Sequence, residues 1–131
     1  MPYGIDAERL RPHASLMMRI CSTDEVPVGE GLRITSVVPP IAIFRTESDD
    51  FYAIDDTCTH QDASLADGWL EGCWVECPLH ASRFDLRTGE VDEPPAKRPV
   101  RVHIVEVKDG DVFVTLSSDV PNLPPGMRVD A

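Results

Sequence analysis

The sequence predicts an all-β protein built from antiparallel strands, and two observations support this prediction. Short segments rich in branched and aromatic residues recur along the 131 residues, and turn residues separate them. No segment of ordinary helical length carries an apolar stripe, so helix is expected only as single turns near residues 6–10 and 62–66. The expected strands are residues 16–21, 32–38, 41–46, 51–55, 74–76, 83–86, 100–107 and 112–116.

The connections between these strands contain residues that favour tight turns. Pro39 and Pro40 separate the second strand from the third, and a Ser-Asp-Asp sequence at 48–50 separates the third from the fourth. The sequence Lys-Asp-Gly-Asp at 108–111 is typical of a hairpin turn and joins the last two strands. Sequential strands are therefore expected to pair antiparallel.

Residues 100–107 show the alternation of a strand with one buried face. Valines alternate with Arg101 and His103, and the pattern slips by one residue at 104–105. We interpret the slip as a bulge, and we place His103 on the solvent-facing side of the strand, outside any functional site.

Length and composition predict one domain with a tail at each end. We expect the domain at 13–117, an N-terminal tail at 1–12 and a proline-rich C-terminal tail at 118–131, which cannot continue a strand. The apolar run at 16–18 is broken by Arg19, so no stretch is long enough for a signal-peptide core or a membrane span. We therefore expect a cytoplasmic protein whose four cysteines bind metal or stay free rather than form disulfides.

The charge balance limits the kinds of partner. Twenty-three acidic and 12 basic residues give a formal net charge of -11, so nucleic acid and anionic membranes would repel the chain. We expect neither as a partner, and a basic protein surface is the natural one.

Two short elements carry side chains that bind metals. Cys58-Thr59-His60 and Cys77-Pro78-Leu79-His80 each pair a thiol with an imidazole, and 16 residues separate them. Four such ligands suit one mononuclear site or one binuclear cluster. Zinc modules usually pair like ligands and place the second pair on a helix, which this sequence does not predict. The spacing therefore favours a cluster and leaves zinc open.

These two elements resemble the two ligand loops of Rieske iron–sulfur proteins. The resemblance continues through the segments at 67–72, 75–76, 83–85, 88–90 and 94–96, and it covers most of residues 15–117. The nearest likeness is to the soluble ferredoxins of bacterial aromatic ring-hydroxylating dioxygenases. It implies a Rieske fold: antiparallel, sandwich-like or barrel-like sheets with a small cluster-binding subdomain inserted at about 56–96, holding one [2Fe–2S] cluster.

The resemblance also implies the ligands. Cys58 and Cys77 are expected on the buried iron, and His60 and His80 on the outer iron. Respiratory Rieske proteins have a disulfide between these loops, at positions that read Ala63 and Leu79 here, so that disulfide is absent.

Three further residues are expected beside the cluster. The Ser82 hydroxyl matches a hydrogen-bond donor of the family, and Leu65 and Leu79 are expected to shield the cluster from water. Phe84 stands where the respiratory type has a second hydroxyl donor, a tyrosine. With one donor missing, we expect a potential near the low end of the Rieske range, roughly -150 mV.

The function implied is electron transfer without catalysis. The resemblance implies a one-electron shuttle from a flavin-dependent reductase to a terminal ring-hydroxylating oxygenase. Two alternatives remain open: a small subunit of another oxidoreductase, of the nitrite reductase kind, and a zinc-stabilised structural module. They differ in assembly state and in metal content.

Overall fold

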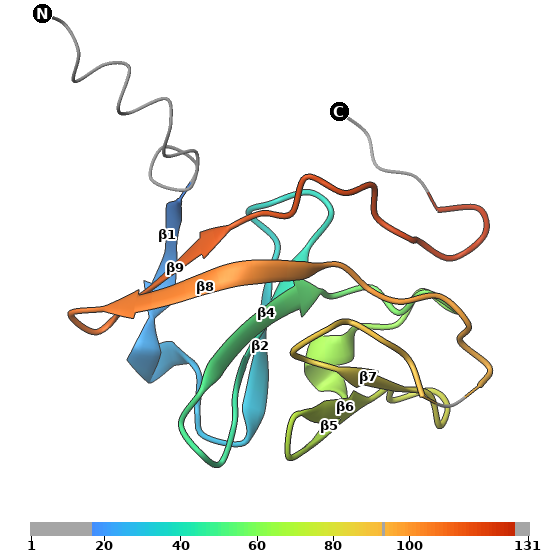
Figure 1. Ribbon diagram of the computed structural model, residues 1–131, viewed down its shortest axis with the longest axis horizontal. Helices are drawn as coiled ribbons and strands as arrows, with labels where there is room; N and C mark the ends of the chain where they lie inside the picture. The colour runs from blue at the N-terminus through green and yellow to red at the C-terminus, as the bar shows by residue number, and fades with distance from the viewer. Residues whose placement is uncertain (1–16, 93, 128–131) are drawn as a thin grey trace, which may run out of the picture.

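The computed structural model describes residues 17–92 and 94–127, and the described chain is all-β with two single-turn 3-10 helices (Figure 1). Within it there is no α-helix, and no helix is long and apolar enough to cross a membrane. The elements are β1 (Met18–Ser22), η1 (Thr23–Glu25), β2 (Glu30–Ile34), β3 (Ile41–Arg45), β4 (Phe51–Asp55), η2 (Leu65–Asp67), β5 (Trp69–Glu71), β6 (Trp74–Glu76), β7 (Arg83–Asp85), β8 (Val102–Lys108) and β9 (Asp111–Thr115).

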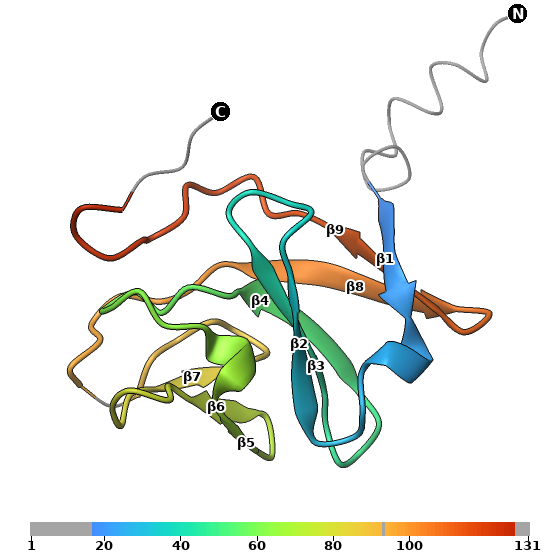
Figure 2. The same ribbon diagram turned by 180° about the vertical axis from the view of Figure 1, so that it is seen from behind.

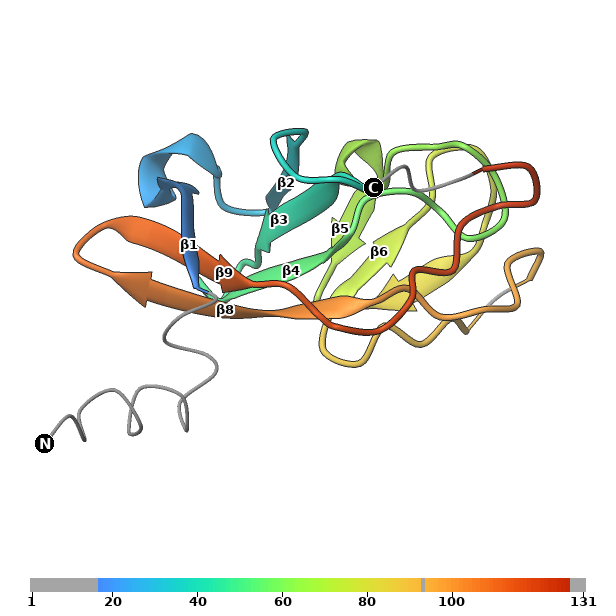
Figure 3. The same cartoon turned by 90° about the horizontal axis from the view of Figure 1, so that it is seen from above.

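The strands form two antiparallel sheets. The larger has the order β1-β9-β8-β4-β3-β2 and is strongly curled, as the view from above shows (Figure 3). The smaller has the order β5-β6-β7 and is inserted in the chain between β4 and β8. Figure 2 shows η2 beside β2, at the junction of the two sheets. The predicted antiparallel pairing and the inserted subdomain are confirmed.

Two hydrophobic cores lie on opposite faces of the larger sheet. In β3, Ile41 and Ile43 belong to the core inside the curled sheet, whereas Ala42 and Phe44 belong to the core shared with the small sheet. Because successive side chains of a strand point to opposite faces, a strand buried on both sides reads as a continuous apolar run. This explains why β3 has no polar position among its first four residues.

The prediction that His103 faces solvent is wrong. His103 is only 3% exposed, and it pairs with Ala53 across β4 and β8 on the inner face of the curled sheet. Its neighbour Val102 packs against the other core, so both faces of β8 are covered at this point. The alternation of apolar and polar residues therefore wrongly indicated that the face carrying His103 is exposed to solvent. The predicted bulge at 104–105 is also wrong: β8 pairs with β9 in unbroken register from Ile104 to Lys108, and the irregularity lies in β1.

Two further strands differ from the prediction. The strand expected at 32–38 runs from Glu30 to Ile34. The three-residue strand β5 was not predicted.

A buried ionic cluster holds the end of β4 to β8. Arg101 donates from Nε and Nη2 to the two carboxylate oxygens of Asp55, at 2.8 and 3.1 Å. The Ser117 backbone N–H donates to His103 Nδ1 at 2.9 Å, so the proton of the neutral ring is on Nε2, which donates to Asp55 Oδ1 at 2.9 Å. Burial alone would raise the pKa of the Asp55 carboxyl, but the hydrogen bonds from His103 and Arg101 hold it below its ordinary value.

Replacing Asp55 by Asn should destabilise the protein by about 3 kcal/mol at neutral pH, because the buried Arg101 charge loses its partner. Since the folded pKa of Asp55 lies below the ordinary 3.8, the carboxylate stabilises the fold above that pH. This stabilisation is lost as the pH falls through the folded pKa. We therefore expect urea unfolding of the wild type and of Asp55→Asn between pH 7 and pH 2.5 to show a difference in the free energy of unfolding. This difference should be constant near neutrality and shrink below about pH 3.8.

Asp111→Asn is the matched control, because Asp111 forms an exposed ion pair with Arg19 at 3.0 Å. An exposed pair of this kind contributes about 0–1 kcal/mol. Equal losses in the two variants, or a difference for Asp55→Asn that does not vary with pH, would contradict the assignment.

Candidate metal centre

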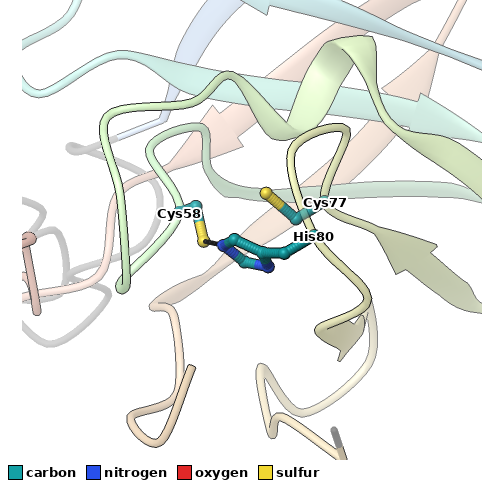
Figure 4. Close-up of side chains that lie close together, drawn as sticks. All are labelled: Cys58, Cys77 and His80. Atoms are coloured by element: carbon teal, nitrogen blue, oxygen red, sulfur yellow. Dashed lines mark hydrogen bonds between the residues drawn. The ribbon is translucent and has the colours of Figure 1, made fainter. Parts of the chain in front are cut away.

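Two loops face each other at one end of the molecule. The first, residues 56–64, connects β4 to η2, and the second, residues 77–82, connects β6 to β7. Figure 4 shows Cys58 on the first loop pointing towards Cys77 and His80 on the second. The fold thus brings together ligand elements that are far apart in the sequence.

Three of the four predicted ligands converge, and the fourth, His60, contacts the group through the ring of His80. One ligand atom from each of Cys58, Cys77 and His80 lies within 4.8 Å of the others, and Cys58 Sγ is 3.5 Å from His80 Nε2. The ring of His60 meets that of His80 edge to face, with centroids 5.0 Å apart. Both cysteines are fully buried, His80 is half-buried and His60 is exposed. The site therefore has a sulfur side inside the protein and an imidazole side towards solvent.

The electrostatics of the site favour a bound cation. The hydrogen bond from Cys77 lowers the pKa of the Cys58 thiol to about 5, against the effect of burial, and the backbone N–H groups of His60 and Gln61 assist. The same hydrogen bond raises the pKa of Cys77. A cysteine binds metal as its thiolate, so the lowered pKa of Cys58 favours a metal ligand at this position. Two thiols and two imidazoles on facing loops fit a binuclear centre with sulfur ligands at one end and nitrogen ligands at the other.

The first ligand loop is closed by hydrogen bonds to its own backbone and to Asp56. The Cys58 N–H donates to the Ala63 carbonyl at 3.0 Å. Asp56 Oδ1 accepts from the Ser64 hydroxyl at 2.8 Å and from the Ala66 N–H at 2.9 Å. Burial raises the pKa of Asp56 in spite of these bonds. This carboxylate fixes the far end of the loop that carries two ligands.

Arg33 of β2 supplies the compensating charge for Asp56. Its Nε lies 3.1 Å from Asp56 Oδ2, in a contact that is ionic rather than an aligned hydrogen bond. The Asp56 side chain is 1% exposed, so this oxygen has no access to bulk water and depends on the guanidinium. The loop is thereby tied to the larger sheet.

The second loop is a tight turn closed by Ser82. The Cys77 N–H donates to the Ser82 carbonyl at 2.9 Å. The buried Ser82 hydroxyl oxygen accepts a hydrogen bond from the Ala96 N–H at 2.8 Å. Because a hydroxyl both accepts and donates, its own proton remains to be donated.

The two leucines differ in their surroundings. Leu65 is fully buried in the core between the sheets, whereas Leu79, beside His80 in the chain, is 61% exposed. Leu79 thus adds an apolar side chain to the surface at this end of the molecule.

A third segment, residues 94–99, completes the surroundings of the site. The Thr59 hydroxyl donates to the Arg98 carbonyl at 2.7 Å, and Arg98 Nη2 donates to the Leu123 carbonyl at 3.0 Å. The described part of the proline-rich segment therefore reaches the ligand end. Figures 1 and 3 show it passing above these loops.

Sequence reasoning missed Asp56, Thr59 and Ala96, which hold the loops rather than ligate. Asp56 left a weak signal, an acidic residue placed directly after a buried strand and before a ligand motif. Ala96 gave no signal of this role, because it acts through its backbone N–H, which donates to the Ser82 hydroxyl oxygen.

Comparison with known families gives a match over most of the chain. The family model described as "Rieske [2Fe-2S] domain" matches residues 17–115. A 3-phenylpropionate/cinnamic acid dioxygenase ferredoxin subunit of Photorhabdus laumondii is 42% identical over 101 residues, which are 76% of this chain and 94% of the relative. A biphenyl dioxygenase ferredoxin subunit of Pseudomonas sp. is 41% identical over 100 residues, 76% of this chain and 91% of the relative.

Solved structures agree with this assignment. A ferredoxin from a complex of oxygenase and ferredoxin in carbazole 1,9a-dioxygenase has a TM-score of 0.69 at 38% identity, over 76% of this chain and 93% of that one. A Sphingomonas yanoikuyae B1 ferredoxin has a TM-score of 0.70 at 30% identity, over 76% and 98%. A structure named as a nitrite reductase small subunit, at 19% identity and a TM-score of 0.65, shares the fold alone.

The family match identifies the cofactor as one [2Fe–2S] cluster, in place of the zinc ion left open by the spacing. The relatives are electron-transfer subunits and not catalysts. The all-β fold, the facing ligand loops and these comparisons lead to one conclusion: the chain belongs to the family of proteins with a Rieske [2Fe–2S] domain.

Proposed function

We propose that this protein carries single electrons from a flavin-dependent reductase to a terminal ring-hydroxylating oxygenase. The observation that carries the proposal is the gradient of exposure across the ligand set, from buried Cys58 and Cys77 to exposed His60. A carrier must bring its redox centre close to the surface of a partner and still exclude water from most of the centre. Electrons then enter and leave on the histidine side.

In this proposal Cys58 and Cys77 ligate the inner iron, and His60 and His80 ligate the outer iron. The cluster, when bound, accepts and releases one electron. Two neutral imidazoles in place of two thiolates raise its potential above that of an all-cysteine cluster. The chain's own contribution is to hold the four side chains in place through the Asp56 and Ser82 contacts.

Residues next to the ligands adjust the site. We assign Ser82 as a hydroxyl donor to the cluster, because its oxygen accepts from Ala96 and its own proton remains to be donated. Phe84 is fully buried in the same core and has no hydroxyl to offer. We assign Leu65 to packing beneath the loops, and Leu79 to shielding the cluster and contacting the partner.

The relatives support the proposed electron acceptor. Those named above are ferredoxin subunits of dioxygenases, and one is described in a complex with its oxygenase. This supports an oxygenase as electron acceptor, with aromatic compounds as the oxygenase's substrates, and we propose the cytoplasm as the location. The nitrite reductase alternative has the weaker support, since those structures are only 19% identical.

Alanine at any of Cys58, His60, Cys77 or His80 should prevent incorporation of the cluster, whereas Cys21→Ser and Cys73→Ser should retain it. Cys21 and Cys73 are free cysteines outside the ligand loops. Iron and sulfide analysis should give two of each per chain in wild type and controls. Electron paramagnetic resonance after dithionite reduction should give a rhombic signal with an average g well below the free-electron value. An intact cluster in a ligand variant would refute the assignment.

Ser82→Ala should lower the reduction potential by roughly 50–100 mV, because a hydrogen bond that strengthens on reduction is lost. For one electron, about 59 mV corresponds to a tenfold change in the equilibrium constant for reduction. Protein-film voltammetry measures this, with exposed Ser118→Ala as control. An unchanged potential in Ser82→Ala would exclude the hydroxyl as a donor. A wild-type potential above about +100 mV would contradict the low-range expectation.

The reduced protein should reduce a matching terminal oxygenase rapidly, and the rate should fall as salt is added, because charged docking surfaces are screened. Stopped-flow mixing with the terminal oxygenases for biphenyl, 3-phenylpropionate and carbazole tests this. A protein that reduces none of them, yet has an intact reducible cluster, would overturn the proposed function. If the protein is instead a permanently bound small subunit of another oxidoreductase, it should form a stable complex with that enzyme on size-exclusion chromatography.

A further inference from the structure

A hollow of about 280 Å³ adjoins the exposed ligand His60. One side is formed by the first ligand loop and another by the segment 94–99, and Pro125 of the C-terminal segment closes a third. The residues lining it are Thr59, His60, Pro95, Lys97, Arg98 and Pro125. The hollow therefore opens on the side of the molecule where the proposed function places electron exit.

The positive charges of this hollow are not compensated, unlike those of the other arginines in the described chain. Every other described arginine forms an ion pair with an aspartate, which for Arg33, Arg45 and Arg101 ties strands and loops together. Arg98 donates instead to the Leu123 carbonyl, which leaves its charge in place. Lys97 is exposed, and within the described residues no ion pair involves it.

The charge of this end is opposite in sign to that of the whole protein. The described segments 56–64, 77–82, 94–99 and 122–127 contain Lys97 and Arg98 against two acidic residues, Asp62 and Asp56, and buried Asp56 is already paired with Arg33. The complete chain has a formal net charge of -11. A local excess of positive charge in so acidic a protein orients a partner, because it attracts an acidic group to this end while the rest of the surface repels it.

We propose that the hollow between Lys97, Arg98 and Pro125 is a docking pocket for a carboxylate side chain of the electron-accepting oxygenase. This rests on the proposed function and names the chemistry of its docking contact. A carboxylate in the hollow pairs with the two cations and lies next to His60, which brings the acceptor surface against the outer end of the cluster.

The C-terminal segment forms one wall of this pocket and is held there by hydrogen bonds. Arg101 Nη1 donates to the carbonyls of Ser117 and Asp119, at 3.3 and 2.8 Å, and Asn122 Nδ2 donates to the Pro99 carbonyl at 3.2 Å. With the Arg98 to Leu123 bond, these contacts hold Pro125 over the hollow. The family match ends at residue 115, so this wall lies outside the part of the chain that the family model describes.

The test uses Lys97→Glu in the cluster-containing protein, with Lys108→Glu as the matched control. Lys108 ends β8 at the hairpin to β9, opposite the ligand loops, and undergoes the same change of charge (Figure 1). Reduced protein is mixed at low ionic strength with ferricyanide, and separately with the cation tris(phenanthroline)cobalt(III). In each case one cluster gives one electron to one oxidant, which is reduced to ferrocyanide or to the cobalt(II) complex.

We expect Lys97→Glu to slow ferricyanide reduction by about threefold or more and to accelerate reduction of the cationic oxidant, while Lys108→Glu changes both rates far less. Opposite responses to the two oxidants report local charge, since a structural defect would not produce them. The rate of electron transfer to an oxygenase that the wild type reduces should fall about tenfold in Lys97→Glu, with the potential and resonance spectrum unchanged.

Each contrary result has a distinct meaning. Equal effects of the two variants on the inorganic oxidants would overturn the local charge excess. Opposite effects on the oxidants with an unchanged rate to the oxygenase would overturn the pocket as a docking site. If the wild type reduces no oxygenase, the proposed function fails, and the identity of the occupant fails with it.

Discussion

Two adjacent buried carboxylates at the end of β4 organise the rest of the molecule. Asp55 and Asp56 follow one another in the chain, so their side chains point to opposite faces of the sheet. Asp55 binds Arg101 and His103 and thereby ties β4 to β8. Asp56 binds the first ligand loop and Arg33 of β2. The position of the ligands therefore depends on charges that the fold must bury and pair.

Buried charges are costly unless paired, and the two aspartates are paired to different extents. Asp55 has two opposing donors and keeps a lowered pKa, whereas the pKa of Asp56 is raised by burial. The negative charge of Asp56 is thus less well stabilised than that of Asp55, and Asp56 is the residue that holds the first ligand loop. The fold places its strongest ion pair where two strands and the C-terminal segment meet, and a more strained contact at the functional loop.

The sequence was sufficient to predict the class of fold and to propose the four ligands, because strand alternation and the Cys-x-His and Cys-x-x-His motifs are local signals. It was insufficient wherever a residue's surroundings come from distant segments. His103 was misplaced because both faces of β8 are covered at that point, which alternation cannot reveal. Ala96 was invisible because its contribution to Ser82 is a backbone N–H. The placement of Pro125 in the same hollow as His60 depends on the contacts of the C-terminal segment.

An acidic protein with a basic hollow at one end solves a specific problem of a shuttle. A carrier must find its partner quickly, dock at one end only and leave again after one electron. Uniform charge gives fast encounter without orientation, whereas a strong apolar patch gives orientation at the cost of slow release. Two cations beside His60, together with the exposed side chain of Leu79, provide orientation through few contacts. The acidic remainder of the surface repels the partner's carboxylate and so limits complexes in which that group lies elsewhere, so a weak contact at one end is enough for selective electron transfer.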